Sequence, residues 1–197
     1  MRVLCAGGRP AATHLGSSVR DFCVLWEHVS VTVDLRLARS SDASGLPEIE
    51  RRAGQRFPLA NDIADHEPRS VEAFVAYANA GRCLVACDNT DRPIGFLLLD
   101  DIDGNAHIEQ VSVEPEHQGM GVGRSLIEQA QAWAKNNRRP GVTLTTFADV
   151  HAPMYTHLGF SVMRDHEIGP ELHALRREEA ARGFDDLMPR VCMMLRL

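Results

Sequence analysis

The stretch Val111–Leu126, which reads VSVEPEHQGMGVGRSL, decides the fold. A strand-like alternation of apolar and polar residues runs into a loop with glycine at positions 119, 121 and 123, and the loop leads directly into an amphipathic helix. Glycine lets a backbone approach a ligand closely, and the first amide groups of a helix lack intrahelical partners at the positive end of the helix dipole. The stretch therefore predicts an anion-binding loop, and phosphate is the usual anion at such a site.

Two common phosphate loops do not match this stretch. The Walker A loop needs Gly-Lys-Ser/Thr after a four-residue spacer, whereas Arg124-Ser125 follows Gly123 here and the spacer is missing. The dinucleotide fingerprint would need a glycine where Arg124 stands. A glycine-rich turn that serves only tight packing is the structural alternative.

Outward from the loop, hydrophobic periodicity predicts one mixed α/β domain over residues 31–197, preceded by a poorly packed N-terminal arm over 1–30. The helix between the strands 107–113 and 142–147 implies that these two strands are parallel. The other strands are expected at 31–37, 83–87, 94–99, 159–162 and 191–197, and the helices at about 40–53, 70–81, 121–139, 152–158 and 170–182.

Composition narrows the function classes. A chain of 197 residues is most simply one domain, and its net charge of −6 argues against a nucleic-acid partner. No apolar run approaches the roughly 18 residues that a membrane helix needs. Cys83, Cys87 and Cys192 lie in apolar runs and are interpreted as small buried side chains rather than zinc ligands. Together with the lack of a signal-peptide pattern in 1–30, this predicts a cytoplasmic protein.

Three motifs in order along the chain resemble the GNAT superfamily of N-acetyltransferases. Gln118 to Gly123 fits the pattern Q/R-x-x-G-x-G/A, a strand ending in Val113-Glu-Pro115 precedes it, and Tyr155 stands before Gly159-Phe160. The motifs cover residues 108–160, and the order of elements from 31 to 197 agrees with the family. The resemblance implies an α+β fold, with a mixed, mostly antiparallel sheet, a splayed central pair of parallel strands and flanking helices.

The resemblance also implies acetyl-CoA as cosubstrate, without a metal. Its diphosphate would lie on the loop amides, and its pantetheine arm would fill the gap between the strands 107–113 and 142–147. The N–H of Val111 is the candidate oxyanion donor, a role worth about 3 kcal/mol. His151 stands where many family members carry an asparagine, and a solvated ring without a role is its alternative. The expected cofactor contacts are Val111, Ser112, Val113, Gln118, Gly119, Met120, Gly121, Val122, Gly123, Arg124, Ser125 and His151.

Acyl transfer to an amine needs a base, because a free alkylamine with a pKa of roughly 10 is charged at neutral pH. Tyr155 occupies the family position whose phenol protonates the departing thiolate, and a purely packing ring is the alternative. Glu109 is the first candidate base, His107 on the same strand is its rival, and a water chain without a single base is the third option. A bulge in this strand would change which of its residues face the site.

The acceptor groove would be lined by the first two helices, by the loop 55–68 and by the segment after Phe160. That loop carries Asp62, Asp65 and Glu67 beside Arg56 and Arg69, which suits a cationic amine if the charges are not simply solvated. The helix 172–182 is expected to show a charged face to solvent.

The resemblance therefore implies an acetyl-CoA-dependent N-acetyltransferase that acts by direct attack of a primary amine on the thioester. The amine could belong to a small molecule, an amino-acid derivative or a peptide. The alternatives are a CoA-binding sensor without turnover, and a toxin that acylates aminoacyl-tRNA, against which the acidic charge counts. The closing strand, with Met193 and Met194, is a candidate surface for a homodimer.

Overall fold

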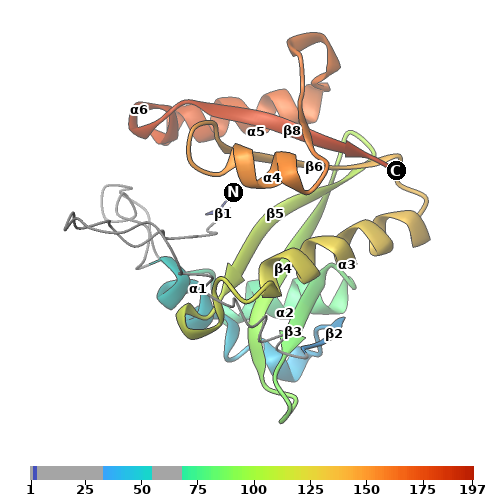
Figure 1. Ribbon diagram of the computed structural model, residues 1–197, viewed down its shortest axis with the longest axis vertical. Coiled ribbons are helices and arrows are strands. Elements are labelled where there is room, and N and C mark those ends of the chain that lie inside the picture. The colour runs from blue at the N-terminus through green and yellow to red at the C-terminus, as the bar shows by residue number, and fades with distance from the viewer. Residues whose placement is uncertain (1, 4–32, 55–67) are drawn as a thin grey trace, which may run out of the picture.

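The computed structural model describes residues 2–3, 33–54 and 68–197. Within them one eight-stranded sheet has the order β2-β3-β4-β5-β6-β8-β7, with β1 beside β5 (Figure 1). The strands are β1 (Arg2–Val3), β2 (Asp34–Leu37), β3 (Cys83–Cys87), β4 (Pro93–Ile102), β5 (Asn105–Val113), β6 (Gly141–Phe147), β7 (Ser161–Val162) and β8 (Arg190–Arg196). The helices are α1 (Leu46–Gly54), α2 (Val71–Asn79), α3 (Val122–Asn136), α4 (Ala152–His157), α5 (Pro170–Ala181) and α6 (Phe184–Leu187), with short 3-10 turns η1 (Ser40–Asp42), η3 (Pro115–His117) and η4 (Asp165–Glu167). The predicted mixed, mostly antiparallel sheet with flanking helices is confirmed.

The central strands β5 and β6 are parallel and separate after a short pairing. Their register joins only Ala106 to Val142 and His107 to Thr143. Beyond His107, β5 continues without β6 as a neighbour, so the two strands form a V that is closed at His107 and open toward the loop before α3. The predicted splayed parallel pair is confirmed.

A bulge interrupts β5 next to this opening. Leu98 of β4 lies opposite Gln110, whereas the next residue, Leu99, lies opposite Ile108, so Glu109 is an extra residue in the strand. Ile108 and Val111 consequently both join the core cluster that includes α3, although residues three apart on a regular strand face opposite sides.

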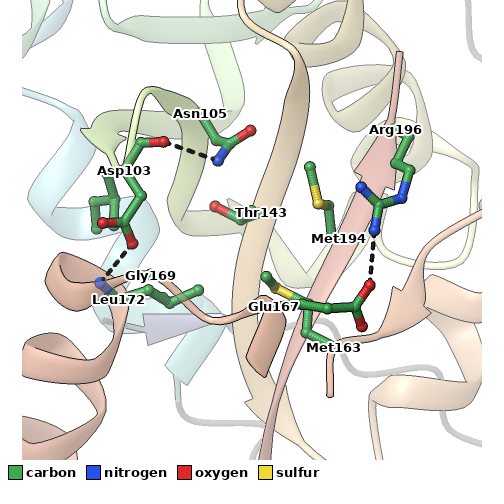
Figure 2. Close-up of a pocket in the computed structure, with 10 residues that line it drawn as sticks. Asp103, Asn105, Thr143, Met163, Glu167, Gly169, Leu172, Met194 and Arg196 are labelled. Carbon is green, nitrogen blue, oxygen red and sulfur yellow. Dashed lines mark hydrogen bonds and ion pairs between the residues drawn. The ribbon is translucent and has the colours of Figure 1, made fainter. Parts of the chain in front are cut away.

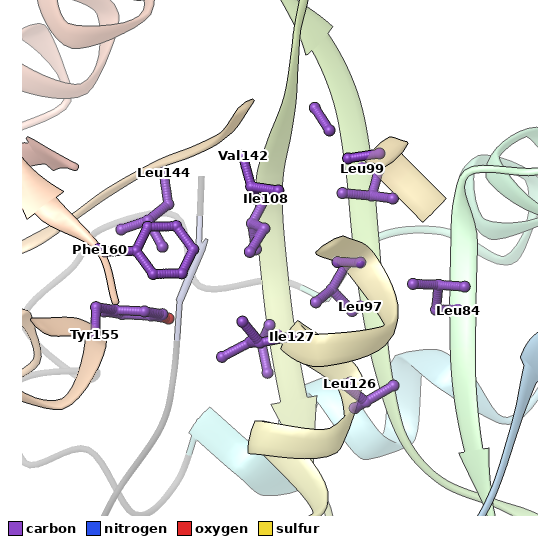
Figure 3. Close-up of a cluster of buried hydrophobic side chains, with 14 of the residues drawn as sticks. Leu84, Leu97, Leu99, Ile108, Leu126, Ile127, Val142, Leu144, Tyr155 and Phe160 are labelled. Atoms are coloured by element: carbon purple, nitrogen blue, oxygen red, sulfur yellow. The ribbon is translucent and has the colours of Figure 1, made fainter. Parts of the chain in front are cut away.

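Two apolar layers cover the faces of the sheet. On one face, Leu126 and Ile127 of α3 pack with residues of β3 to β6 and with Tyr155 and Phe160 (Figure 3). On the other face, Phe74 of α2 lies edge-on to Phe96 at 5.1 Å between ring centroids, in a second cluster with α1. Cys83 and Cys87 are fully buried in that second cluster, which confirms their interpretation as small buried side chains.

Helix α5 corrects one expectation, because part of its charged surface is buried. Glu179 is only 1% exposed and accepts hydrogen bonds from Thr145 of β6 at 2.6 Å and from Arg176 at 2.6 Å. Arg190 of β8 also pairs with Glu179, at 3.2 Å. Since Thr145 alternates with Leu144 of the α3 side, this network fastens α5 to the face opposite α3. The neighbouring Glu178 is exposed, as predicted for the helix as a whole.

Strand β8 limits which of its residues could belong to the candidate homodimer surface. It lies between β6 and β7, with antiparallel partners on both sides, and Met193 is fully buried in the main core. Met193 is therefore unavailable for a homodimer contact. Helix α6 and the 3-10 turns η3 and η4 are not among the predicted elements, since four residues or fewer carry too little periodicity to detect. The turn η1 lies at the start of the helix predicted at about 40–53, whose α-helical part begins at Leu46. No helix in the described part of the chain is long and apolar enough to cross a membrane.

Candidate active site

The loop before α3 has an open backbone. Gly119 and Gly121 have φ values of 79° and 87°, in the left-handed region that glycine adopts readily. A Cβ placed on either residue would meet no atom within 4 Å, so the space beside the loop is free for a ligand. The first helical hydrogen bond runs from the N–H of Ser125 to the oxygen of Gly121 at 2.9 Å. The N–H groups of the three preceding residues thus lack intrahelical acceptors and can bind an anion.

The loop is fastened on both sides. The Gln118 side-chain amide donates to the Val113 carbonyl at 2.9 Å, which ties the loop to the end of β5. Arg52 of α1 pairs with Glu114 at 3.1 Å and also with Glu116. Burial raises the pKa of Glu114, and the positive charge of Arg52 opposes that rise. These contacts hold the loop in a fixed position relative to the open end of the V.

The edge of β5 inside the V accepts an extended partner. The strand β1 pairs with it in parallel, with Arg2 opposite Gln110 and Val3 opposite Val111. This is the edge on which the resemblance places the pantetheine arm. The backbone at Val111 can therefore pair with an extended ligand, but β1 and such a ligand cannot use the same edge at once. The open loop and the strand edge together fit a ligand that has an anionic group at one end and an extended chain attached to it.

Tyr155 lies on the α3 side of the opening. Its side chain is fully buried, and its ring meets Phe160 edge-on at 5.7 Å between centroids. Figure 3 shows it projecting from α4 toward β5, beside Leu144 and Phe160. The ring therefore packs the short helix onto the sheet, and its hydroxyl lies on the same side as the opening of the V.

Glu109, the extra residue at the bulge, pairs with Arg69, which precedes α2. The side chains are 9% and 26% exposed, respectively, so both are largely withdrawn from solvent. The Arg69 Nε lies 3.4 Å from the side-chain oxygen of Gln110, and its backbone N–H donates to Glu50 of α1 at 3.0 Å. Gln110 in turn donates to Ser112 at 3.0 Å. A polar cluster thus covers the central strand on the face that α1 and α2 share.

His107 lies deeper in the same strand. It is fully buried, and its Nδ1 is 2.9 Å from the Thr143 hydroxyl oxygen. Burial lowers its pKa to about 4, although the negative charges of Glu179 and Asp100 oppose the shift. The ring is therefore neutral at neutral pH and shielded from solvent.

His151 is the N-cap residue of α4 and is buried at 3% exposure, so the alternative of a solvated ring is wrong. Its carbonyl accepts the N–H of Met154 at 3.0 Å, and its ring lies 6.2 Å from that of Phe147. At the loop itself Met120 is exposed. The Arg124 side chain pairs with Glu128 on the exposed surface of α3, so Arg124 can serve the loop through its backbone N–H.

A cavity of about 300 Å³ lies at the closed end of the V, on the α5 side of the sheet (Figure 2). None of the predicted catalytic or cofactor-binding residues lines it. Asp103, at its rim, accepts the N–H groups of Glu171 and Leu172 at 3.0 Å each and so caps α5. The lining residues are Ile102, Asp103, Asn105, Thr143, Met163, Glu167, Gly169, Leu172, Met194 and Arg196.

The structure brings together the predicted loop, the β5 edge and Glu109, and it adds two residues. Sequence alone shows Arg69 only as one of the charges of an acceptor loop, and it gives no signal for Glu50. No local pattern places Arg69 beside Glu109, which lies 40 positions away, or Glu50 beside Arg69, which lies 19 positions away. Of that loop, Arg56, Asp62, Asp65 and Glu67 lie outside the described residues.

Comparisons with known proteins agree with this architecture. The model of the acetyltransferase (GNAT) family matches residues 47–160, more than half of the chain. The peptidyl-lysine N-acetyltransferase YjaB of Escherichia coli K12 is 38% identical over 50 residues, which make up 25% of this chain and only 31% of that protein.

Solved structures share the fold at low identity. The PaiA N-acetyltransferase of Thermoplasma acidophilum, in complex with coenzyme A, has a TM-score of 0.62 at 16% identity and covers 84% of this chain and 99% of its own. The N-acetylglutamate synthase of Neisseria gonorrhoeae, complexed with coenzyme A and N-acetylglutamate, has a TM-score of 0.64 at 16% identity, over 84% of this chain and 35% of its own. With its motifs, splayed sheet and family match, the chain belongs to the acetyltransferase (GNAT) family.

Proposed function

We propose that this protein is an acetyl-CoA-dependent N-acetyltransferase that acts on a primary amine by direct attack. The observation that carries the proposal is the open V between β5 and β6, which ends at a glycine loop with free helix amides. The N–H groups of Val122, Gly123 and Arg124 would hold the diphosphate, and the edge at Gln110 and Val111 would hold the pantetheine arm. Coenzyme A present in solved structures of the same fold supports the choice of this ligand.

The cosubstrate supplies a thioester carbonyl and a thiolate leaving group. In the proposed reaction the amine nitrogen forms a bond to the carbonyl carbon, and the carbon–sulfur bond breaks. The N–H of Val111 stabilises the developing oxyanion, worth about 3 kcal/mol. The proton of the nitrogen passes to the base, and the Tyr155 phenol protonates the sulfur. Both groups then return to their starting states by proton exchange with water.

Glu109 is the better base of the two candidates. His107 is fully enclosed and its Nδ1 is bound to Thr143, whereas the Glu109 side chain keeps 9% exposure on the acceptor face. We therefore assign proton removal to Glu109, directly or through a water molecule.

The test is release of free thiol from acetyl-CoA in the presence of a broad panel of amines. The panel should include lysine peptides and free amino acids, since the relatives named above act on lysine or produce N-acetylglutamate. Thiol release that depends on an amine, with a fall of at least about tenfold in Tyr155→Phe, supports the enzyme. His157→Ala, an exposed change on the same helix, should leave the rate unchanged.

The second candidate is a CoA-binding sensor, because the proposed cofactor features would serve binding alone. Tight binding of CoA without thiol release across the whole panel would favour it and overturn the enzymatic proposal.

Cys83, Cys87 and Cys192 are free thiols buried in the fold, which supports our further proposal of a reducing, cytoplasmic setting.

A further inference from the structure

The guanidinium group of Arg69 stands beside the proposed base. Arg69 pairs with Glu109 through Nη2 and approaches Gln110 through Nε at 3.4 Å. Its own backbone is fixed by Glu50, which accepts the Arg69 N–H at 3.0 Å. The side chain keeps 26% exposure, against 9% for Glu109, so the guanidinium is the more accessible half of the pair.

The guanidinium also has hydrogen-bonding capacity left over. It carries five N–H donors, and within the described residues its side chain has recorded acceptors only for Nε and Nη2. The remaining edge, which includes Nη1, can therefore bind a further acceptor. A planar fork of this kind matches a carboxylate, which it binds through two parallel hydrogen bonds.

The fork is held in a defined orientation. The Arg69 guanidinium carbon lies 5.9 Å from the centre of the Tyr77 ring, which supports it by a cation–π contact. The Tyr77 hydroxyl donates to Asp100 at 2.9 Å, so the ring is itself anchored to β4. A preorganised cation loses less entropy on binding than a mobile surface arginine would.

We propose that Arg69 binds the carboxylate of the acceptor and that the acceptor is a free α-amino acid. The inference rests on the proposed function, because it takes Glu109 as the site where the amine gives up its proton. The Glu109 and Arg69 side chains are in contact, so when an amine lies at Glu109 the rest of the acceptor molecule lies beside Arg69. In an α-amino acid the carboxylate is attached to the same carbon as the amine. One molecule can therefore reach both side chains, with its ammonium group at Glu109 and its carboxylate at Arg69.

The experiment compares three matched sets of acceptors: the proteinogenic L-amino acids, their α-amides and the corresponding decarboxylated amines. We expect the wild-type protein to release thiol with at least one amino acid and to prefer it to its amide and its amine. Arg69→Gln should lower kcat/KM for that amino acid at least about thirtyfold, mainly through KM. Its loss for the amide should be at least about tenfold smaller, because the amide is affected only by the lost pairing of Arg69 with Glu109. The kcat/KM of Arg69→Lys for the amino acid should lie between those of the wild type and of Arg69→Gln, because an ammonium keeps the positive charge but lacks the planar pair of donors.

Arg82→Gln is the matched control. Arg82 stacks on the same ring at 5.6 Å and pairs with Asp100 at 3.2 Å, but no contact with Glu109 is recorded for it within the described residues. It should leave both amino acid and amide turnover unchanged. An equal loss for all acceptors in Arg69→Gln would show that Arg69 only positions Glu109, and would overturn the inference. A wild-type preference for amides, amines or lysine peptides would overturn it as well.

Binding separates this inference from the proposed function. Calorimetric titration of the CoA-loaded protein with each amino acid reports recognition without turnover. Binding that Arg69→Gln abolishes, with no thiol release, would support the carboxylate site and refute the enzyme. Thiol release with other amines, but neither binding nor turnover of any amino acid, would support the enzyme and refute the carboxylate site.

Discussion

Gly121 offers the most direct test of the proposed cofactor loop, and Gly104 supplies a matched control. Both have positive φ, 87° and 73°, and a Cβ on either would meet no atom within 4 Å. Gly121 stands at the N-terminus of α3, whereas Gly104 lies in the turn between β4 and β5, at the closed end of the V. Gly121→Val and Gly104→Val therefore introduce the same backbone strain, but only the first fills the space beside the loop.

The strain can be estimated from the backbone. A residue with a Cβ in the left-handed region costs about 1–2 kcal/mol, so each variant should unfold about 2–8 °C below the wild type. CoA at about a hundred times its Kd stabilises a protein by about 2.7 kcal/mol, which corresponds to a rise of about 5–11 °C. If the valine weakens binding about a hundredfold, the same CoA concentration stabilises by only about 0.4 kcal/mol, or about 1–2 °C.

The assay is thermal unfolding of both variants with and without CoA, followed by calorimetric titration. We expect similar melting temperatures without ligand, a full upward shift with CoA in Gly104→Val, and almost none in Gly121→Val. A full shift in Gly121→Val would refute the placement of the diphosphate on this loop. Loss of the shift in Gly104→Val would show that strain alone explains the effect.

Three further predictions concern the rest of the molecule. Glu179→Ala should lower the free energy of unfolding by about 3–5 kcal/mol, because it leaves Arg190 charged at 3% exposure, while exposed Glu178→Ala changes it little in urea titrations. The free energy of unfolding should fall between pH 6.5 and about pH 4 because of His107. Its pKa is lower in the folded protein than in the unfolded chain, so over this range the unfolded chain binds a proton that the folded protein does not. The His107 contribution is fully present above pH 6.5, and roughly 3 kcal/mol is lost once the pH has fallen below the folded pKa. In urea titrations at several pH values, His107→Asn should flatten this fall in the free energy of unfolding, whereas the exposed change His166→Asn should not. A chain that begins at residue 33 lacks β1 and should bind CoA at least as tightly in calorimetry as the full chain, because β1 no longer occupies the edge at Val111; weaker binding would contradict that competition.

Much of this fold could be predicted from periodicity and from turn residues. The strands 83–87 and 107–113, the cap at Ser70 and the helix after Gly121 lie where apolar runs, helical spacing and capping residues predict them. Local patterns succeed there because the burial of an element shows in its own sequence. The strand 83–87 is buried at every position and is apolar throughout, whereas the helix after Gly121 has buried apolar residues at helical spacing.

Contacts between distant segments could not be predicted in this way. The charged run in α5 gave no sign that Glu179 would meet Thr145 and Arg190, because periodicity does not say which polar residue finds a partner across the fold. The same holds for the pair of Arg69 and Glu109, because a residue that precedes a helix and a residue at a strand bulge meet only once the sheet has formed. The pairing of β1 with Val111 also depends on an edge that only the splayed strands expose.

The extra residue in β5 is an insertion into a strand that would be complete without it. If Glu109 were deleted, Ile108 would be followed directly by Gln110, and the two residues would still lie opposite the consecutive residues Leu99 and Leu98 of β4. The alternation of side chains would then run on unbroken, and Val111 would still face α3. The core therefore needs the residues on either side of Glu109, whereas only the proposed chemistry needs the carboxylate. At this position the requirements of folding and those of catalysis are carried by different residues.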